Sequence, residues 1–144
     1  MVIRALGADH YDSVMNLWRR SGLSSLRPNG RDSREAFARQ ISQVDSQVVL
    51  GLEDDGRLVG VVVVTHDGRK GWINRLAVDP SERRKGYASR LVAAAEKVLH
   101  EKGIEVIAVL IERENTDSLA LFRDLGYRWH DDIYYLSKRD STEA

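Results

Sequence analysis

The spacing of apolar and polar residues predicts a short strand and two helices in the first third of the chain. Residues 2–6 form an apolar stretch that is typical of a strand. Further apolar positions then recur at helical spacing and end before Gly22: Tyr11, Val14, Met15 and Trp18. Asp32 followed by Glu35 forms a capping-box pattern that predicts the start of a second helix after an irregular stretch at 21–31.

Three strands are predicted in the middle of the chain. The apolar runs 47–53 and 58–66 flank the turn Asp54-Asp55-Gly56, which is a strong hairpin signal. A second turn at 67–68 leads to a strand at 72–78. We expect an antiparallel meander, with residues 58–64 covered on both faces because they are almost continuously apolar.

The remaining pattern predicts a long helix, a buried strand, a short helix and one or two final strands. Their ranges are 86–102, 106–111, 115–125 and 127–138, and residues 140–144 are expected to fray. The predicted fold is therefore α/β (α+β), with a mixed, mostly antiparallel sheet of six to seven strands and about four helices. We expect a single domain over residues 1–139, because no linker or repeat interrupts the pattern.

Composition narrows the range of functions. The chain has 144 residues, 22 Lys plus Arg against 22 Asp plus Glu, and no cysteine. The absence of cysteine excludes cysteine-bound intermediates, disulfides and thiolate metal sites. The balanced charge argues against nucleic-acid or membrane partners. The four histidines are scattered, so no metal is predicted. The N-terminus lacks the pattern of a secretory signal, so a cytoplasmic location is expected.

The most informative stretch is residues 76–89, where a strand runs through a short loop into the long helix. The start of a helix offers free N–H groups and the positive end of its dipole, and therefore binds phosphate. Gly86 and Ala88 leave this backbone accessible, while Arg83, Arg84 and Lys85 add positive charge. The alternative is an ordinary turn glycine beside a solvated basic patch.

Two motifs in this order carry a family resemblance. Arg83, Gly86 and Ala88 match Q/R-x-x-G-x-G/A, and a second pattern, N-x-x-A/S-x-x-x-Y-x-x-x-G-F/Y, is matched by Asn115, Ser118, Gly126 and Tyr127. The chain thus resembles the GNAT superfamily of N-acetyltransferases over essentially its whole length. Residues 66–71 resemble the small bacterial YpeA-type branch.

This resemblance implies acetyl-coenzyme A as co-substrate and a sheet that splays between its fourth and fifth strands. The amides at about 84–89 would hold the coenzyme pyrophosphate, and the strand at 76–78 would pair with pantetheine. The implied coenzyme-binding residues are Leu76, Ala77, Val78, Arg83, Arg84, Lys85, Gly86, Tyr87, Ala88, Ser89, Asn115, Ser118 and Phe122.

The sequence departs from the family pattern at the proton-transfer positions. Phe122 replaces the tyrosine that protonates the leaving thiolate in many members, so Tyr127, Tyr134 or Tyr135 become candidate donors. The usual strand carboxylate is also missing, since Asn74 and Arg75 stand there. Glu112 is our first candidate for a general base, followed by Glu53 and His66. Each of these has an ordinary structural or solvated role as its alternative.

The expected function is acetyl transfer to a primary amine by direct attack in a ternary complex. The acceptor is either a small molecule or a protein N-terminus or lysine. Arginines in the stretch 19–31 could serve an acceptor with a carboxylate or phosphate, but a merely solvated basic loop is the favoured interpretation of them. From another class, an acyl-coenzyme A binding module without turnover would also explain the departures at the proton-transfer positions. The resemblance is compatible with a homodimer.

Overall fold

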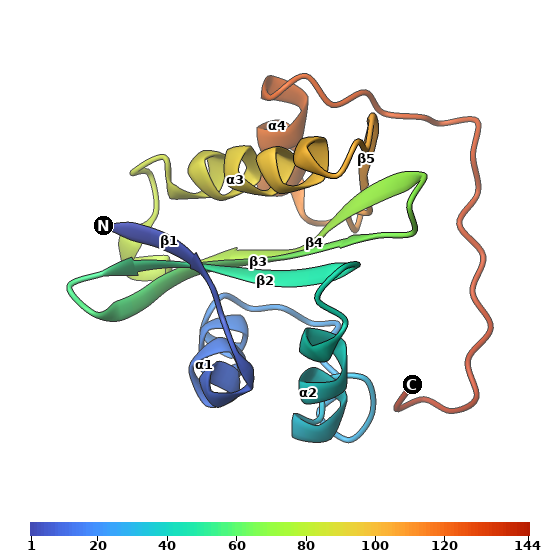
Figure 1. Ribbon diagram of the computed structural model, residues 1–144. Helices are drawn as coiled ribbons and strands as arrows, with labels where there is room; N and C mark the ends of the chain where they lie inside the picture. Colours follow the sequence, from blue (N-terminus) through green and yellow to red (C-terminus); the bar gives the residue numbers. More distant parts are fainter.

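The computed structural model describes residues 1–144 and is built around one five-stranded sheet (Figure 1). The strands lie in sequence order across the sheet: β1 (Val2–Ala5), β2 (Gln47–Asp54), β3 (Arg57–His66), β4 (Lys70–Val78) and β5 (Val106–Val109). The first four pair antiparallel, whereas β5 runs parallel to β4. A mixed, mostly antiparallel sheet is therefore confirmed.

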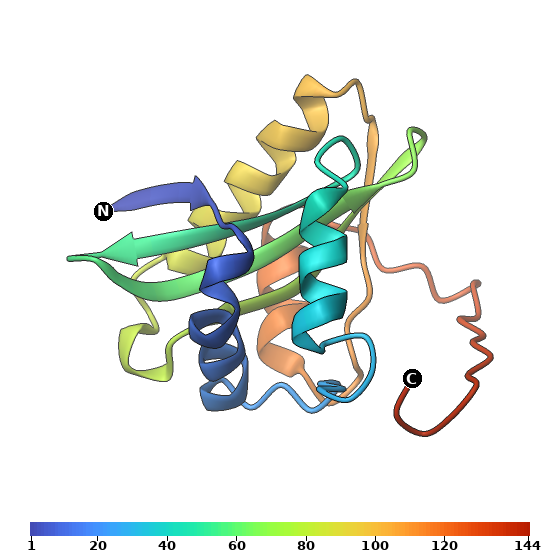
Figure 2. The same cartoon turned by 60° about the horizontal axis from the view of Figure 1, so that its bottom comes forward.

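Helices cover both faces of this sheet. Figures 1 and 2 place α1 (Tyr11–Arg20) and α2 (Arg34–Ser42) on one face, and α3 (Tyr87–Glu101) and α4 (Thr116–Asp124) on the other. Two short 3-10 helices, Ala8–His10 and Pro80–Glu82, precede α1 and α3. The four predicted α-helices are thus present, and none of them is both long and apolar enough to cross a membrane.

Local sequence signals set most of the boundaries. The turn between β2 and β3 uses Asp55 and Gly56, both at positive φ as a two-residue hairpin turn of this type requires. Gly22 ends α1 at φ 82°, and Gly103 follows α3 at φ 78°. The predicted cap of α2 was wrong by one residue, because Ser33 accepts the hydrogen bond from Ala36 N–H at 3.1 Å.

The core lies on both sides of β3, as its continuous apolar run predicts. Val59, Val62 and Val64 pack with α3, whereas Val61 packs with the apolar face of α1. All four valines are at most 2% exposed. The sheet is therefore a buried layer between two helical layers, which fixes the ends of its strands relative to the helices.

The prediction of six to seven strands was wrong, because the segment 127–138 contains no strand. This segment leaves the end of α4 and runs along the outside of the molecule in an extended path (Figures 1 and 2). Its residues have the composition of a strand, but a strand also needs a neighbouring backbone to complete its hydrogen bonds, and the segment does not lie along β5.

The sheet opens between β4 and β5, as predicted. Their parallel pairing extends only from Lys70 opposite Val106 to Ile73 opposite Val109, while β4 continues to Val78. A bulge in β4 coincides with this point, where the register against β3 shifts and Arg75 adopts φ 51°. The second half of β4 therefore presents an unpaired backbone edge on the side of β5.

Candidate functional site

The loop from the open end of β4 into α3 forms the centre of the candidate site. Asp79 caps the 3-10 helix Pro80–Glu82: its Oδ1 accepts hydrogen bonds from Ser81 N–H at 3.0 Å and from Ser81 Oγ at 2.8 Å. Pro80 follows the cap, at a position where its missing N–H costs nothing. The sequence Asp79-Pro80-Ser81 therefore builds the turn that aims the chain at α3.

Two carboxylates anchor this loop to the rest of the domain. Asp79 Oδ2 lies 2.9 Å from Arg20 Nη2 and 3.3 Å from Arg57 Nη1, and Arg57 also contacts Glu82 at 2.7 Å. The Ser81 N–H, the Ser81 hydroxyl and Arg20 hold the pKa of the Asp79 carboxyl below its ordinary value. Both carboxylates stay ionised at neutral pH, so ion pairs join the loop to α1 and β3.

The main chain after this turn has a run of seven N–H groups that no protein atom accepts. None of the backbone N–H groups from Arg83 to Ser89 donates a hydrogen bond within the protein. Gly86 is the N-cap of α3 at φ 77°, and Arg84 is at φ 66°. Successive free amides at a helix start create a concentrated positive dipole, so this backbone can bind a multiply charged anion.

The side chains of Arg83, Arg84 and Lys85 are not equivalent. Lys85 Nζ lies 2.5 Å from Glu82 Oε2, and this hydrogen bond raises the pKa of the lysine while lowering that of the glutamate. Arg83 and Arg84 are exposed and make no ion pair. Lys85 thus holds the loop together, and the two arginines supply the charge that is free to meet an anion.

The predicted strand residues lie next to this loop on the open part of β4. Ala77 is buried on the α1 side of the sheet, whereas Leu76 and Val78 are partly buried against the cluster under α3. On their other side Ala77 and Val78 pair with Val61 and Gly60 of β3. Only the edge toward β5 is left to pair with another extended molecule.

On the opposite face, the β4 bulge carries a partly buried arginine. The Arg75 guanidinium packs over the Trp18 ring at 5.1 Å, and its Nη1 lies 2.8 Å from Asp32 Oδ1 without the alignment of a hydrogen bond. Burial lowers the pKa of Arg75, although Asp32 opposes this effect. Arg75 Nη2 and Arg31 Nη2 also donate to Ser25 O at 3.3 and 3.2 Å. The irregular stretch between α1 and α2 is thereby fixed over the bulge.

The second motif residues lie at the start and on the inner face of α4. Asn115 Oδ1 caps this helix by accepting the Ser118 N–H at 3.1 Å, and Ser118 is partly buried. Phe122 is 3% exposed and belongs to the core cluster that α3 covers. Its ring meets the Tyr127 ring edge-on, with centroids 5.0 Å apart. Phe122 therefore packs as a core residue of α4.

Three of the candidate proton-transfer residues, Tyr127, Glu112 and Tyr134, are not brought together. Tyr127 donates from its hydroxyl to Glu96 Oε2 at 2.7 Å, and burial together with Glu96 raises the pKa of Tyr127 well above its ordinary value. Glu112 is exposed just beyond β5. Tyr134 is 89% exposed on the extended C-terminal segment.

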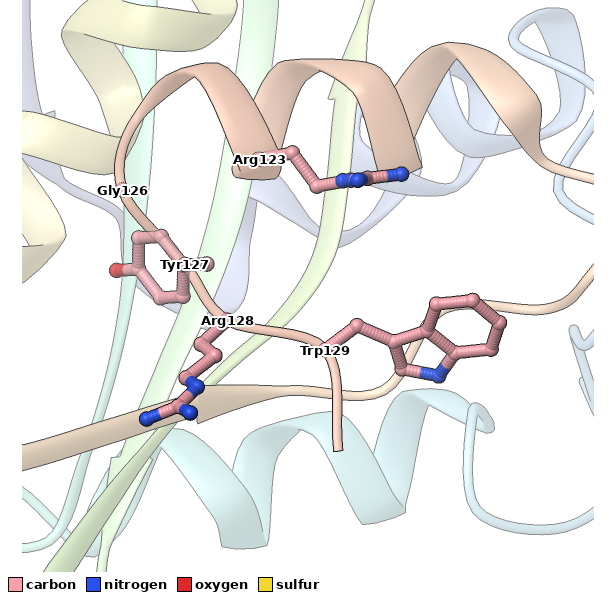
Figure 3. Close-up of a pocket in the computed structure, with 5 residues that line it drawn as sticks. All are labelled: Arg123, Gly126, Tyr127, Arg128 and Trp129. Atoms are coloured by element: carbon pink, nitrogen blue, oxygen red, sulfur yellow. The ribbon is translucent and has the colours of Figure 1, made fainter. Parts of the chain in front are cut away.

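Figure 3 shows the open depression where this segment leaves the domain. The depression measures about 570 Å³ and is lined by Arg123, Gly126, Tyr127, Arg128 and Trp129. Arg123 extends from α4, whereas Arg128 and Trp129 point in different directions. The Tyr127 hydroxyl binds α3 at Glu96, about 15 Å along the helix from Gly86. The depression is therefore separate from the free amides.

Sequence reasoning missed the residues that hold the loop from outside. Arg20 and Arg57 come from α1 and β3, and nothing in their local sequence links them to residues 79–82. The cap at Asp79 could have been found, because aspartate followed by proline and serine is a helix-start signal. No group of three or more His, Asp or Glu side chains is arranged to hold a metal ion.

Comparisons with known proteins agree with this geometry. Residues 11–127 match the model of the acetyltransferase (GNAT) family. The curated protein "Acetyltransferase SG1711" of Sodalis glossinidius (strain morsitans) is 30% identical over 139 residues, covering 96% of this chain and 95% of that protein. The resemblance of residues 66–71 to the YpeA-type branch stays a prediction.

Two solved structures show the same fold. The PaiA N-acetyltransferase of Thermoplasma acidophilum in complex with coenzyme A has a TM-score of 0.78 at 21% identity, covering 92% of this chain and 94% of that one. AAC(6')-Iy, in complex with the bisubstrate analogue CoA-S-monomethyl-acetylneamine, also has a TM-score of 0.78, at 22% identity and with 96% and 97% coverage.

Proposed function

Since the chain belongs to the GNAT acetyltransferase family, we propose that it transfers an acetyl group from acetyl-coenzyme A to a primary amine by direct attack in a ternary complex. One observation carries the proposal: seven consecutive free amides at the start of α3 adjoin the open edge of β4. The free amides suit a pyrophosphate, and the open edge of β4 suits an extended arm that carries amide groups.

The loop suits the coenzyme pyrophosphate in both charge and shape. The amides from Arg84 to Ser89 are the expected donors, and Gly86 permits the left-handed backbone that turns them toward one place. Arg83 and Arg84 add cationic side chains on the same loop. The carboxylates of Asp79 and Glu82 do not oppose this charge freely, because each is already paired with arginine or lysine.

The pantetheine arm would lie along Leu76, Ala77 and Val78. Its amides would form strand-like hydrogen bonds with the edge of β4 that β5 leaves unpaired, as in other cases of strand addition. This placement brings the thioester carbonyl to the bulge, where a backbone N–H near Ala77 or Val78 stabilises the oxyanion. Asn115 and Ser118 line the α4 side of the same opening in this proposal, and Phe122 packs behind them in the core.

The acceptor approaches from the α1 and α2 side. Its neutral nitrogen forms the new C–N bond, the C–S bond breaks, and the coenzyme thiolate takes up a proton. Glu112 is the first candidate to remove the ammonium proton, acting through water from its exposed position beyond β5. Tyr127 is a weaker candidate to protonate the thiolate, because its raised pKa and its bond to Glu96 make its proton harder to release. Tyr134 would need its segment to approach the site.

A small amine is the preferred acceptor class. Support comes from AAC(6')-Iy, which was crystallised with an acetylneamine analogue and shares the fold. Arg27 and Arg31 lie on the stretch that closes over the bulge, but both donate to carbonyl groups of that same stretch. These bonds leave fewer guanidinium N–H groups of the two arginines free to donate to an anionic acceptor.

The first experiment measures binding and turnover separately. Purified protein is titrated with acetyl-coenzyme A by calorimetry, and thiol release is then followed with a panel of small amines and of peptides with free N-termini or lysines. Saturable binding with release from small amines is the expected result. Release from peptides alone would reassign the acceptor, and binding without any release would indicate a module without turnover. Absence of binding at millimolar coenzyme would contradict the proposal.

A further inference from the structure

The irregular stretch between α1 and α2, residues 21–33, is joined at both ends to the open half of β4. At its start, Arg20 Nη2 lies 2.9 Å from Oδ2 of Asp79, the residue that follows β4. At its end, Asp32 Oδ1 lies 2.8 Å from Arg75 Nη1 at the β4 bulge. Two ion pairs therefore connect the side from which the acceptor approaches to the strand that is proposed to hold the pantetheine arm.

The pair at Arg75 is better shielded from water than the pair at Arg20. The Arg20 side chain is 48% exposed, whereas the side chains of Arg75 and Asp32 are 15% and 8% exposed. The Arg75 guanidinium also packs over the Trp18 ring, which covers one of its faces. Because a partly buried pair is screened less than an exposed one, Arg75 provides the stronger of the two connections.

Arg75 contacts the stretch 21–33 at two points, and one of them organises the stretch itself. Its Nη2 donates to Ser25 O at 3.3 Å, and its Nη1 faces Asp32. Asp32 in turn accepts the Arg27 N–H through Oδ2 at 2.7 Å, and its own N–H donates to Arg27 O at 2.9 Å. The planar guanidinium reaches both points at once, which the single ammonium of a lysine cannot do.

The backbone of Arg75 is in a conformation that arginine rarely adopts. Its φ is 51°, in the left-handed region that glycine enters without strain. The Trp18 Nε1–H donates to Arg75 O at 3.2 Å and fixes this carbonyl at the bulge. Strained residues persist only where their surroundings hold them, and they are concentrated at functional sites. Glycine would form the bulge more easily, so the arginine side chain has a role of its own.

We propose that Arg75 is a positioning residue for the acceptor amine. It holds the stretch 21–33 over the β4 bulge, and the stretch then places the amine at the distance and angle from which it attacks the thioester. The inference rests on the proposed function, which brings the thioester carbonyl to the bulge and the acceptor to the α1 and α2 side. Arg75 acts through the stretch, because its Nη1 is enclosed by protein and faces Asp32.

Loss of these contacts should affect the amine and the coenzyme differently. Displacement of a reacting group by about 1 Å can lower a rate by about a hundredfold. Without Arg75 the amine is held less firmly, so its KM should rise by about tenfold or more. The free amides at 83–89 keep the anchors at Asp79 and Glu82, so the Kd of acetyl-coenzyme A should change by less than about threefold.

Two arginines at positive φ provide a matched pair of variants. Arg75→Gly and Arg84→Gly each remove one charge and the same kind of backbone strain, since φ is 51° at Arg75 and 66° at Arg84. Arg84 is exposed on the coenzyme loop and far from Asp32 in its contacts, because it makes no ion pair. Arg84→Gly should therefore weaken coenzyme binding and leave the amine KM unchanged at saturating coenzyme, the reverse of Arg75→Gly. Arg75→Lys, which can keep one of the two contacts, should give a KM between those of the native chain and Arg75→Gly.

Hydrogen exchange measures the contacts of Arg75 without any turnover. In the free protein, amides of residues 21–33 should exchange about tenfold faster or more in Arg75→Gly and at the native rate in Arg84→Gly. Amides of β3, in the core, should exchange at the native rate in both variants, which shows that they are folded. Calorimetry then gives the Kd of acetyl-coenzyme A. Thiol release with the small amine of the panel that the native chain acetylates fastest gives KM and kcat.

Three results would overturn the proposal. They are equal exchange of residues 21–33 in the native chain and Arg75→Gly, an amine KM that Arg75→Gly leaves unchanged while kcat falls, and an equal loss of coenzyme affinity in Arg75→Gly and Arg84→Gly. The second result is that of a merely structural defect, which lowers the fraction of active protein. A native chain that releases no thiol with any amine would contradict the proposed function and the positioning role together, whereas faster exchange in Arg75→Gly would still support the contacts that hold the stretch.

Discussion

Gly86 and Gly103, at opposite ends of α3, allow coenzyme binding to be tested apart from folding. Gly86 has φ 77° and Gly103 has φ 78°, and no atom lies within 4 Å of a Cβ added at either position. A glutamate at either site therefore meets the same backbone strain, about 1–2 kcal/mol, and no steric clash. The two substitutions also add the same charge, so they form a matched pair.

The pair should differ sharply in coenzyme affinity. At a separation of about 5 Å between the Gly86→Glu carboxylate and the proposed pyrophosphate, one pair of like charges costs about 3 kcal/mol at an effective dielectric constant of 20. This cost corresponds to weaker binding by roughly a hundredfold or more. Gly103→Glu lies about 25 Å away along the helix, beyond the ~8 Å screening length at physiological salt, and should change the affinity by less than about threefold.

Calorimetric titration with acetyl-coenzyme A at 150 mM salt measures the two affinities, and thermal unfolding checks that both variants are folded. The effect at Gly86 should shrink at higher salt, because it is electrostatic. Unchanged affinity in Gly86→Glu, or an equal loss in both variants, would refute the assignment of the free amides to the pyrophosphate.

Three further predictions concern stability and proton transfer. Asp32→Ala leaves the partly buried Arg75 charge without its carboxylate and should lower the free energy of unfolding by about 2 kcal/mol in urea titrations, and a stability like that of the native chain would count against this pair. The pKa of Asp79 is lowered in the folded state, so its stabilising contribution is complete above the unfolded pKa near 4 and is lost as the pH falls through the folded value. Urea midpoints at pH 6 and pH 3 should therefore differ less in Asp79→Asn than in the native chain, and equal differences would contradict this role. Tyr127→Phe removes the bond to Glu96 and should cost about 1 kcal/mol of stability while kcat falls by less than about threefold, whereas a kcat loss above tenfold would instead assign Tyr127 as the proton donor.

The middle of the fold was predictable because its signals are local. The hairpin turn at Asp55 and Gly56 needs only two residues at positive φ, and the apolar run of β3 reports its burial on both faces. The segment 127–138 was not predictable in the same way. Its composition shows that it can form a strand, but whether a strand forms depends on a partner backbone that the composition does not contain.

In the candidate site, too, the features set by neighbouring residues were predictable and those set by distant residues were not. The free amides depend on consecutive residues around Gly86, so the sequence indicated them directly. The ion pairs from Arg20 and Arg57 join distant segments, and they became visible only when the fold brought α1 and β3 to the loop. The role of Asp32 was missed for the same reason: its pattern indicated a cap, whereas its partner Arg75 lies 43 residues away, the difference between positions 75 and 32.

The anchoring of the loop by Asp79 and Glu82 also bears on how quickly a ligand is captured. Because these ion pairs and the cap at Asp79 fix the peptide planes during folding, the amides need no rearrangement when an anion arrives. The ordering entropy that a mobile loop would lose at the moment of binding has already been lost. Capture of the coenzyme is then governed by the encounter itself, and differences in affinity among related ligands arise mainly in how long each one stays bound.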